Sequence, residues 1–382
     1  MKNVDDGSTT PQWVPAMPIR NSKVLQILPQ LPGTLDGVGD YALNLAKALW
    51  AEHGVMTVFA VAQETTVASK DGFQVISGLN ERSVHSMADH VILHYVNYGY
   101  QVRGIPFHLR RFARQLRRKL RGRWLTTFHE LYASGPPWKS EFWLRPLQVK
   151  IARDMVDISD ACFVSNKTVE NEIQAYDSAK KIYLAPVLSN FGEPELTDFT
   201  GSSPKQWAIC GGTALVARSL LSFQQIQHAI PAAYVPEQLQ VIGGRDDRGT
   251  RALVDSLNNG TRGLACTYHP EVSVERASEL LKDCSFAWLD YFRTGKIWPG
   301  MILKSGAFAA FCAHAVVPVL SHQEGTFAVD GAAFPGPYFI APGAVNFPPL
   351  DSLQAIRGKI YAWYQAHASS PRLSRIYAEA LA

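Results

Sequence analysis

The chain has 382 residues, of which 47% are hydrophobic and 18% are charged, and its formal net charge is +4. This balance is typical of globular proteins and excludes a disordered chain, while the length exceeds what one hydrophobic core serves, so two or three domains are expected. The five cysteines are scattered and form no C-x-x-C pair, which disfavours a zinc site or a disulfide framework and predicts reduced core cysteines in a cytosolic protein.

The first half of the chain alternates short apolar runs with amphipathic stretches. Residues 1–20 are polar, lack the apolar segment of a signal peptide, and are expected to form a flexible arm. Strands are expected at residues 23–28, 55–61, 90–95, 123–129, 160–165 and 180–185, with a further short strand near 72–77. This alternation predicts βαβ units around a parallel sheet, in a domain of residues 21–190.

The same alternation resumes after a break. Residues 191–205 are rich in Pro, Gly, Ser and acidic residues, which indicates an interdomain linker. Strands are then expected within residues 206–212, 239–244, 263–269, 285–291, 316–321 and 337–341, giving a second domain of residues 206–350, and residues 351–382 are expected to form C-terminal helices. The longest apolar run, residues 307–320, is too short to span a bilayer.

A glycine turn follows the first expected strand. The stretch from Gly37 to Ala42 has the pattern G-x-G-x-x-A, and Asp40 or a neighbour is placed to cap the helix that follows. A dinucleotide fingerprint needs its first glycine directly after the strand, whereas eight residues separate Leu28 from Gly37, which disfavours NAD. The alternatives are a flexible turn, or a helix N-terminus whose amides face a phosphate held by the other domain.

The order and spacing of several segments resemble GT-B glycosyltransferases of the large retaining family four type, in a divergent bacterial subgroup. The similar segments are residues 31–50, 94–109, 126–144, 158–173 and 266–291. The resemblance implies an α/β protein of two Rossmann-like parallel-sheet domains facing a cleft. It implies an acceptor in the first domain and a nucleotide-diphosphate sugar in the second, with no metal or other cofactor.

The resemblance also implies a donor site built from cations and helix N-termini, because fixed donors stabilise the departing diphosphate. Arg218 and Lys304 are the expected cations, and the amides of Ser305 and Gly306 are expected at a helix start. The expected donor-binding residues are Gly37, Gly39, Arg218, Lys304, Ser305, Gly306, His269 and Asp290.

The sequence departs from the family pattern at the donor site. The family has two glutamates there, whereas no Asp or Glu occurs between Tyr291 and Leu320. Asp290 and Lys304 are the expected substitutes. The departure also favours an alternative, a non-catalytic GT-B protein that binds a nucleotide sugar or a partner.

The catalytic and acceptor residues are expected at strand ends of the first domain, where open α/β sheets bind ligands. His129 is expected to hydrogen-bond the transferred sugar or to move a proton, and Glu130 to act as a base or to orient the histidine. An ordinary buried hydrogen-bonded pair is the alternative. The expected acceptor-binding residues are Tyr95, Asn97, Tyr98 and Arg103, unless their side chains merely fill the loop.

Residues 108–123 predict a strongly basic helix, with eight Lys or Arg residues and no acid. A solvated basic face is the ordinary interpretation, but uncompensated cations favour an anionic partner, here an anionic membrane surface. The residues expected to face the membrane are Arg110, Arg111, Arg114, Arg117, Arg118 and Lys119. Nucleic acid is disfavoured because the basic stretch is confined to one helix and no nucleic-acid motif is present.

The resemblance, taken with these features, implies a metal-independent, retaining glycosyltransferase. It would transfer a sugar from a nucleotide-diphosphate sugar to a saccharide or lipid-linked acceptor in bacterial cell-surface polysaccharide or glycolipid synthesis. The protein would be cytoplasmic and peripheral on the inner face of the membrane. A non-catalytic GT-B protein, an NAD-dependent enzyme and a nucleic-acid binder remain the rival hypotheses.

Overall fold

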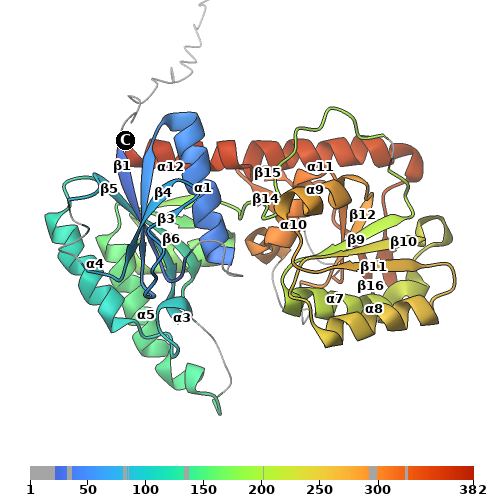
Figure 1. Cartoon of the computed structure of the whole chain (residues 1–382), viewed down its shortest axis with the longest axis horizontal. Coiled ribbons are helices and arrows are strands. Elements are labelled where there is room, and N and C mark those ends of the chain that lie inside the picture. The colour runs from blue at the N-terminus through green and yellow to red at the C-terminus, as the bar shows by residue number, and fades with distance from the viewer. Residues whose placement is uncertain are drawn as a thin grey trace, which may run out of the picture.

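Two α/β domains lie side by side in the computed structural model, which describes residues 22–31, 37–80, 84, 86–132, 137–200, 202–291, 299–322 and 326–382 (Figure 1). The expected arm of residues 1–20 lies outside the described residues. Both domains have a mainly parallel central sheet, so the predicted fold class is confirmed.

The N-terminal domain follows the predicted strands to within one or two residues at each end. Its strands are β1 (Lys23–Leu28), β2 (Met56–Val61), β3 (Ser69–Lys70), β4 (Phe73–Ser77), β5 (His90–Val96), β6 (Trp124–Glu130), β7 (Ala161–Val164) and β8 (Lys181–Leu184). Its helices are α1 (Gly37–His53), α3 (Asn97–Tyr100), α4 (Phe107–Lys119), α5 (Ser140–Ile158) and α6 (Lys167–Tyr176). The sheet order is β3-β4-β2-β1-β5-β6-β7-β8, and only β3 runs antiparallel to its neighbour.

The C-terminal domain repeats this architecture. Its strands are β9 (Gln206–Cys210), β10 (Gln238–Ile242), β11 (Ala265–His269), β12 (Phe286–Leu289), β13 (Val317–Leu320), β14 (Ala328–Val329), β15 (Ala332–Ala333), β16 (Tyr338–Ala341) and β17 (Ala344–Asn346). Its helices are α7 (Thr213–Ile226), α8 (Arg248–Gly260), α9 (Val274–Lys282) and α10 (Gly306–Ala313), with 3-10 turns η1 (Gln227–Ala229), η2 (Ala232–Tyr234), η3 (Pro299–Lys304) and η4 (Leu350–Ser352). The main sheet has the order β11-β10-β9-β12-β13-β16-β17.

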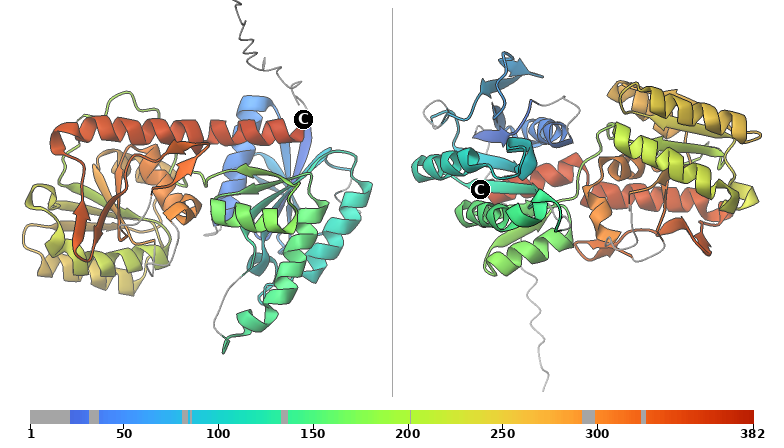
Figure 2. Two further views of the ribbon diagram at one scale, coloured as in Figure 1. Left: turned by 180° about the vertical axis from the view of Figure 1, so that it is seen from behind. Right: turned by 90° about the horizontal axis from the view of Figure 1, so that it is seen from below.

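Helices cover both faces of each sheet (Figure 2), which explains why the strands appear in the sequence as continuous apolar runs. In β1 and β2 every residue after the first is buried, and β9 and β12 are equally enclosed. In both domains the first strand lies inside the sheet, so the chain reverses its winding beside it. Ligands of open α/β sheets bind at such a reversal, outside the carboxyl ends of the strands.

The C-terminal residues form two helices that serve different domains. Helix α11 (Leu353–His367) packs on the C-terminal domain, where Ile360 and Tyr364 join its core. Helix α12 (Ser370–Leu381) crosses to the N-terminal domain and packs against α1, with Leu373 and Tyr377 buried there (Figure 1). The sequence predicted the helices but not this crossing.

The interdomain segment is held against these helices. Glu193 accepts hydrogen bonds from the amide and hydroxyl of Ser370, at 3.0 and 2.6 Å, and from the Tyr364 hydroxyl at 2.6 Å. The Tyr361 hydroxyl donates to the Pro194 carbonyl at 3.0 Å. The composition that predicts a linker therefore corresponds to a segment that is hydrogen-bonded along α11 and the start of α12.

Candidate functional site

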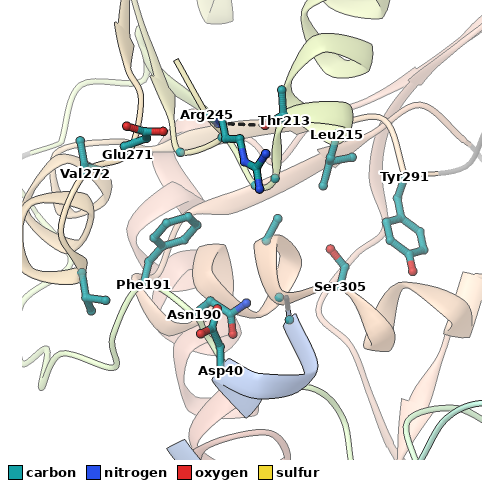
Figure 3. A pocket seen from close by; sticks show the side chains of 18 residues that line it. Asp40, Asn190, Phe191, Thr213, Leu215, Arg245, Glu271, Val272, Tyr291 and Ser305 are labelled. Carbon is teal, nitrogen blue, oxygen red and sulfur yellow. Dashed lines mark hydrogen bonds between the residues drawn. The ribbon is translucent and has the colours of Figure 1, made fainter. Parts of the chain in front are cut away.

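A cavity of about 880 Å³ lies between the two domains (Figure 3). From the N-terminal domain it is lined by the start of α1, and from the segment between the domains by residues 190–191. The C-terminal domain contributes the turns that follow β9, β10, β11 and β12, and the starts of α7, α9 and α10. The cavity therefore lies where the carboxyl ends of the C-terminal strands face the other domain.

Two glycine pairs form the turns after the central strands. Gly211 and Gly212 follow β9, and Gly243 and Gly244 follow β10. A side chain at Gly243 would place its Cβ 2.7 Å from the Gly211 carbonyl oxygen, and the residue has a φ of +91°. Only glycine fits there, because the two turns touch each other through their backbones. Gly212 is different: it has a φ of −72°, and a Cβ on it meets nothing within 4 Å.

Four of the described helices, α1, α7, α9 and α10, begin at the cavity. Helix α7 begins directly after Gly212 with no side-chain cap, so its first amides lack the usual capping acceptor. Helix α10 begins at Gly306, and the Ser305 hydroxyl accepts a hydrogen bond from the Phe308 amide at 3.2 Å. Helix α1 begins at Gly37 and approaches from the N-terminal domain. Amides and helix dipoles that converge on one cavity favour an anionic group such as a phosphate.

The side chains of the described lining add one cation, Arg245, and two carboxylates, Asp40 and Glu271 (Figure 3). The Arg245 amide donates to the Thr213 hydroxyl at 2.8 Å, which joins the turn after β10 to the start of α7. The Glu271 amide donates to the Gly244 carbonyl at 3.0 Å. A net excess of carboxylate side chains in this described lining means that an anion would be bound mainly by backbone amides.

Asn190 lies between the domains and belongs to the same lining. Its side-chain amide packs on the start of α10, because a Cβ on Gly306 would meet the Asn190 Nδ2 atom at 3.0 Å. Its Oδ1 atom is buried and has no hydrogen-bond partner among the described residues. Figure 3 shows Asn190 beside Asp40 of α1. This region of the cavity therefore offers acceptor oxygens, which suit the hydroxyl groups of a ligand.

Three of the eight expected donor residues line this cavity: Gly37, Ser305 and Gly306. Gly39 is buried within the first turn of α1, and Asp40 occupies the first turn rather than the cap, because the helix begins at Gly37. His269 Nε2 pairs with Gln240 Oε1 at 2.8 Å on the neighbouring strand, so it is not among the described residues of the lining.

Arg218 and Asp290 bind each other rather than lining the cavity. The Arg218 Nε atom donates to the Asp290 carbonyl at 2.7 Å, and the Asp290 carboxylate accepts a hydrogen bond from the Ser321 hydroxyl at 2.7 Å. These contacts fix the end of β12, from which Tyr291 reaches the cavity. The two residues were expected to line the donor site, but they lie behind the lining and hold it in place.

Lys304 and Glu130 join the domains. The Lys304 Nζ atom donates to Glu130 Oε1 at 3.1 Å, and the two side chains are 27% and 44% exposed. The expected donor cation and the expected catalytic base therefore neutralise each other in this structure. The pair is also partly solvated, so its contribution to stability is small, on the order of 1 kcal/mol or less.

His129 ends a chain of buried hydrogen bonds. Its Nε2 atom lies 3.1 Å from His94 Nδ1, and His94 Nε2 lies 2.8 Å from Gln26 Oε1. Gln26 in turn donates to the Thr57 hydroxyl at 3.3 Å. Because Gln26 Oε1 only accepts, His94 donates from Nε2, and its Nδ1 accepts the proton of His129 Nε2. This tautomer leaves His129 Nδ1 as an acceptor.

Both imidazoles are neutral near pH 7. Burial lowers the pKa of His94 well below its usual value of 6.5, and burial together with the Lys304 ammonium lowers the pKa of His129 to about 3. A neutral His129 has no proton to give as an acid at Nδ1. Its chemistry at this position is that of a hydrogen-bond acceptor or a weak base.

These pKa shifts predict acid sensitivity. In the unfolded chain both imidazoles bind protons below about pH 6.5, whereas the folded chain does not protonate His129 until about pH 3, so the free energy of unfolding falls as the pH is lowered between these values. We expect His129 to account for a loss of about 2 kcal/mol by about pH 5. Urea unfolding at a series of pH values across this range checks the prediction. His129→Gln should make the free energy of unfolding depend less on pH, and an unchanged pH dependence would contradict the assignment.

The expected acceptor residues mostly serve the local structure. Tyr95 is fully buried in the N-terminal core, and its hydroxyl finds no hydrogen-bond partner among the described residues, so it does not reach an acceptor. Buried Asn97 donates to the Gly104 carbonyl at 3.4 Å, and the Tyr98 hydroxyl accepts from Gln148 at 3.0 Å. Arg103 is exposed. The loop-filling alternative describes Asn97 and Tyr98 better.

The basic helix α4 is partly neutralised by its neighbours. Arg110 and Arg114 both bind Asp154 of α5, and the Arg114 Nη2 to Asp154 Oδ1 distance is 2.7 Å. Arg117 binds Asp160 at 3.0 Å. The expectation of uncompensated charge is therefore wrong for these three arginines, because acids about 40 residues later in the chain pack beside them.

The sequence reasoning missed Asn190, Arg245 and Glu271, and it overlooked both glycine pairs. The pairs had a readable signal, since each follows an apolar strand directly, and such turns let ligands approach the backbone. Arg245 had a weaker signal, which is its position directly after the second Gly-Gly pair. Asn190 and Glu271 had none, because only the packing of separate segments brings them to the cavity.

The described residues contain no cluster of three or more His, Cys, Asp or Glu side chains placed to hold a metal ion. Within the same residues no helix combines the length and the apolar character needed to cross a bilayer.

Comparison with solved structures identifies the fold. An alpha-glucosyltransferase in complex with UDP matches with a TM-score of 0.58 and 11% identity, over 94% of this chain and 99% of that one. A UDP-forming alpha,alpha-trehalose-phosphate synthase from Burkholderia xenovorans matches with a TM-score of 0.55 and 12% identity, over 94% and 98%.

A further match is an alpha-glucosyltransferase in complex with UDP and a 13-mer DNA, with a TM-score of 0.56 and 10% identity, over 94% and 99%. No protein-family model and no curated protein matches the chain. The chain therefore has the GT-B fold, with two Rossmann-like domains on either side of the cavity.

Proposed function

We propose that this protein is a glycosyltransferase that binds a nucleotide-diphosphate sugar in the cavity between its domains. The observation that carries the proposal is the convergence of the N-termini of α1, α7 and α10 and of two glycine turns on that cavity. The similar solved structures support it, because the alpha-glucosyltransferase holds UDP in a chain of the same fold.

The chemistry of the lining suits such a ligand. Amides at Gly212, Thr213 and Gly306 would hold the diphosphate, whose charge grows as the sugar leaves. Arg245 would add the side-chain cation. Glu271 would accept hydrogen bonds from hydroxyl groups at the β11 side of the cavity. The lining thus offers amide donors for an anionic group and carboxylate acceptors for hydroxyl groups. A ligand with an anionic middle and hydroxyl-rich ends matches this arrangement.

The N-terminal domain would contribute to the sugar and the acceptor. Asp40 and Asn190 offer acceptor oxygens on its side of the cavity. His129 lies outside the described lining, and its neutral Nδ1 would serve an acceptor that reaches the end of β6. The Lys304–Glu130 pair would hold the two domains together across the same gap. Transfer with retention and without a metal ion is part of this proposal, in which backbone amides and Arg245 would take the place of a metal at the diphosphate.

The finer setting is also a proposal. The acceptor would be a saccharide or a lipid-linked glycan used for bacterial cell-surface polysaccharide or glycolipid synthesis. The protein would work in the cytoplasm at the inner face of the membrane, with exposed cations of α4 such as Arg111 and Arg118 toward the lipid. A nucleic-acid partner is not part of this proposal.

A nucleotide panel tests the donor proposal. We expect UDP, or another nucleoside diphosphate, to raise the melting temperature of the purified protein, because a ligand bound by the native state stabilises it by about 2.7 kcal/mol at a hundred times its Kd. NAD should give no shift. The best nucleoside diphosphate should then identify the sugar donor, whose hydrolysis or transfer is measured directly.

The panel also separates the rival functions. A shift with NAD alone would contradict the proposal and favour a nicotinamide enzyme. A nucleotide-sugar shift without turnover of any donor would favour the non-catalytic GT-B protein. If no nucleotide shifts the melting temperature, the proposal that this cavity is the donor site is wrong.

A further inference from the structure

The first turns of α5 project from the N-terminal domain (Figure 1). They and the residues just before them carry exposed aromatic side chains. Trp138, just before the helix, is 83% exposed, and Trp143 is 70% exposed. Phe142 and Leu147 are also exposed on these turns. We call these four side chains the aromatic tip. Large apolar side chains gathered at a projecting end indicate an interaction surface, whereas scattered ones do not.

The tip has internal contacts that fix its shape. The Trp143 Nε1 atom donates to the Pro137 carbonyl at 2.8 Å, and the ring of Phe142 meets that of Trp143 edge-on with centroids 5.3 Å apart. Both rings therefore remain at the surface while being held in place. A surface that is preorganised in this way loses little conformational entropy when it binds.

A second segment extends the apolar surface. Gln148 of α5 donates to the Arg103 carbonyl at 2.9 Å, which holds the loop before α4 against the first half of α5. This loop exposes Val102, and the first residue of α4, Phe107, is also exposed. The loop that exposes Val102 is thus attached to α5 at the residue that follows Leu147, the last member of the aromatic tip.

Positive charge surrounds this surface. Between Pro137 and Arg153 the sequence has four cations and a single acid, Glu141. The exposed cations nearest to the aromatic tip in the chain or through the Gln148 contact are Arg103, Lys139, Arg145 and Lys150. An exposed aromatic surface with a cationic rim matches the interfacial layer of an anionic bilayer, where indole rings lie at the level of the headgroups.

We propose that the aromatic tip inserts into the interfacial layer of an anionic phospholipid membrane, with the surrounding cations on the headgroups. The tip follows β6, whose last residue, Glu130, faces Lys304 across the gap between the domains. Membrane contact at this place would hold the N-terminal domain, the proposed acceptor domain, against a bilayer that carries a lipid-linked acceptor. The inference rests on the proposed function for the acceptor, but membrane binding is measurable without any donor.

Vesicle binding by the full chain tests this. We expect the protein to sediment with phosphatidylcholine vesicles that contain phosphatidylglycerol, and less at high salt because screening weakens the cationic rim. The double variant Trp138→Ala/Trp143→Ala should bind them about tenfold more weakly. Trp50→Ala is the matched control, since Trp50 is a half-exposed tryptophan on α1, and it should bind like the parent chain.

Each outcome decides the proposal. Loss of vesicle binding in the double variant, with unchanged melting temperature and unchanged nucleotide binding, supports it and leaves the donor site untouched. Equal binding by the double variant, or equal binding to vesicles of phosphatidylcholine alone, overturns it. A tip-dependent dimer, or tip-dependent retention of a DNA duplex with no vesicle binding, overturns it in favour of another partner.

Discussion

Replacing Gly212 by leucine should abolish nucleotide binding while leaving the fold intact. Gly212 has an ordinary φ of −72°, and a Cβ there meets nothing within 4 Å, so the new side chain enters the open cavity without backbone strain. It would stand at the uncapped start of α7, where the diphosphate is proposed to bind. We expect the affinity for UDP to fall about a hundredfold, or ~2.7 kcal/mol, by isothermal titration.

Two further substitutions make this result specific. Gly260→Leu is the matched control, because Gly260 also has open space around its Cβ but lies at the end of α8, outside the described lining. It should bind UDP normally. Gly243→Ala should instead destabilise the protein, since its Cβ would lie 2.7 Å from the Gly211 carbonyl oxygen. Normal UDP affinity in Gly212→Leu would show that the cavity is not the donor site.

Removing the ring of Tyr377 should strongly destabilise the protein. This residue of α12 is fully buried in the N-terminal domain and stacks on Phe163 with ring centroids 3.8 Å apart. Its hydroxyl bonds to Thr127 and lies 3.2 Å from the Tyr41 hydroxyl. Tyr377→Ala should lower the free energy of unfolding by about 3–5 kcal/mol, measured by urea unfolding, because it leaves a cavity and two unpaired hydroxyls.

Companion variants separate packing from hydrogen bonding. Tyr377→Phe keeps the stacked ring and should cost about 1–3 kcal/mol through the hydroxyls left without a partner. Glu379→Ala, on the exposed side of the same helix, should change stability by about 0.5 kcal/mol or less. If Tyr377→Ala unfolds at the same urea concentration as Glu379→Ala, the packing of α12 on the N-terminal domain is not what stabilises that domain.

The predicted strands agree with the structure because strands that are buried on both faces of a sheet need apolar residues at nearly every position. They therefore appear in the sequence as continuous apolar runs. The apolar run at residues 23–28 forms β1. In the first apolar run expected for the second domain, residues 206–210 form β9. Residues that approach a ligand through the backbone also leave a local signal. Gly37 was expected near the donor for this reason, Gly306 was expected there from the family resemblance, and both line the cavity.

Side-chain roles were harder to predict, because a charge in the sequence does not show its partner. Arg218 was expected at the diphosphate, but its Nε atom donates a hydrogen bond to the carbonyl of Asp290, 72 residues later. Lys304 was expected there too, and it pairs with Glu130 of the other domain. Whether a charged side chain is neutralised depends on which elements pack beside it, and the local sequence does not show which elements those are.

By itself, the sequence determined the alternation of strands and helices and the division into two domains, because each depends on local patterns of burial. Only the tertiary structure decided which residues share the cavity, which arginines are already paired, and that α12 closes the N-terminal core with Tyr377. These depend on contacts between segments far apart in the chain, and such contacts form only when the sheets and helices pack.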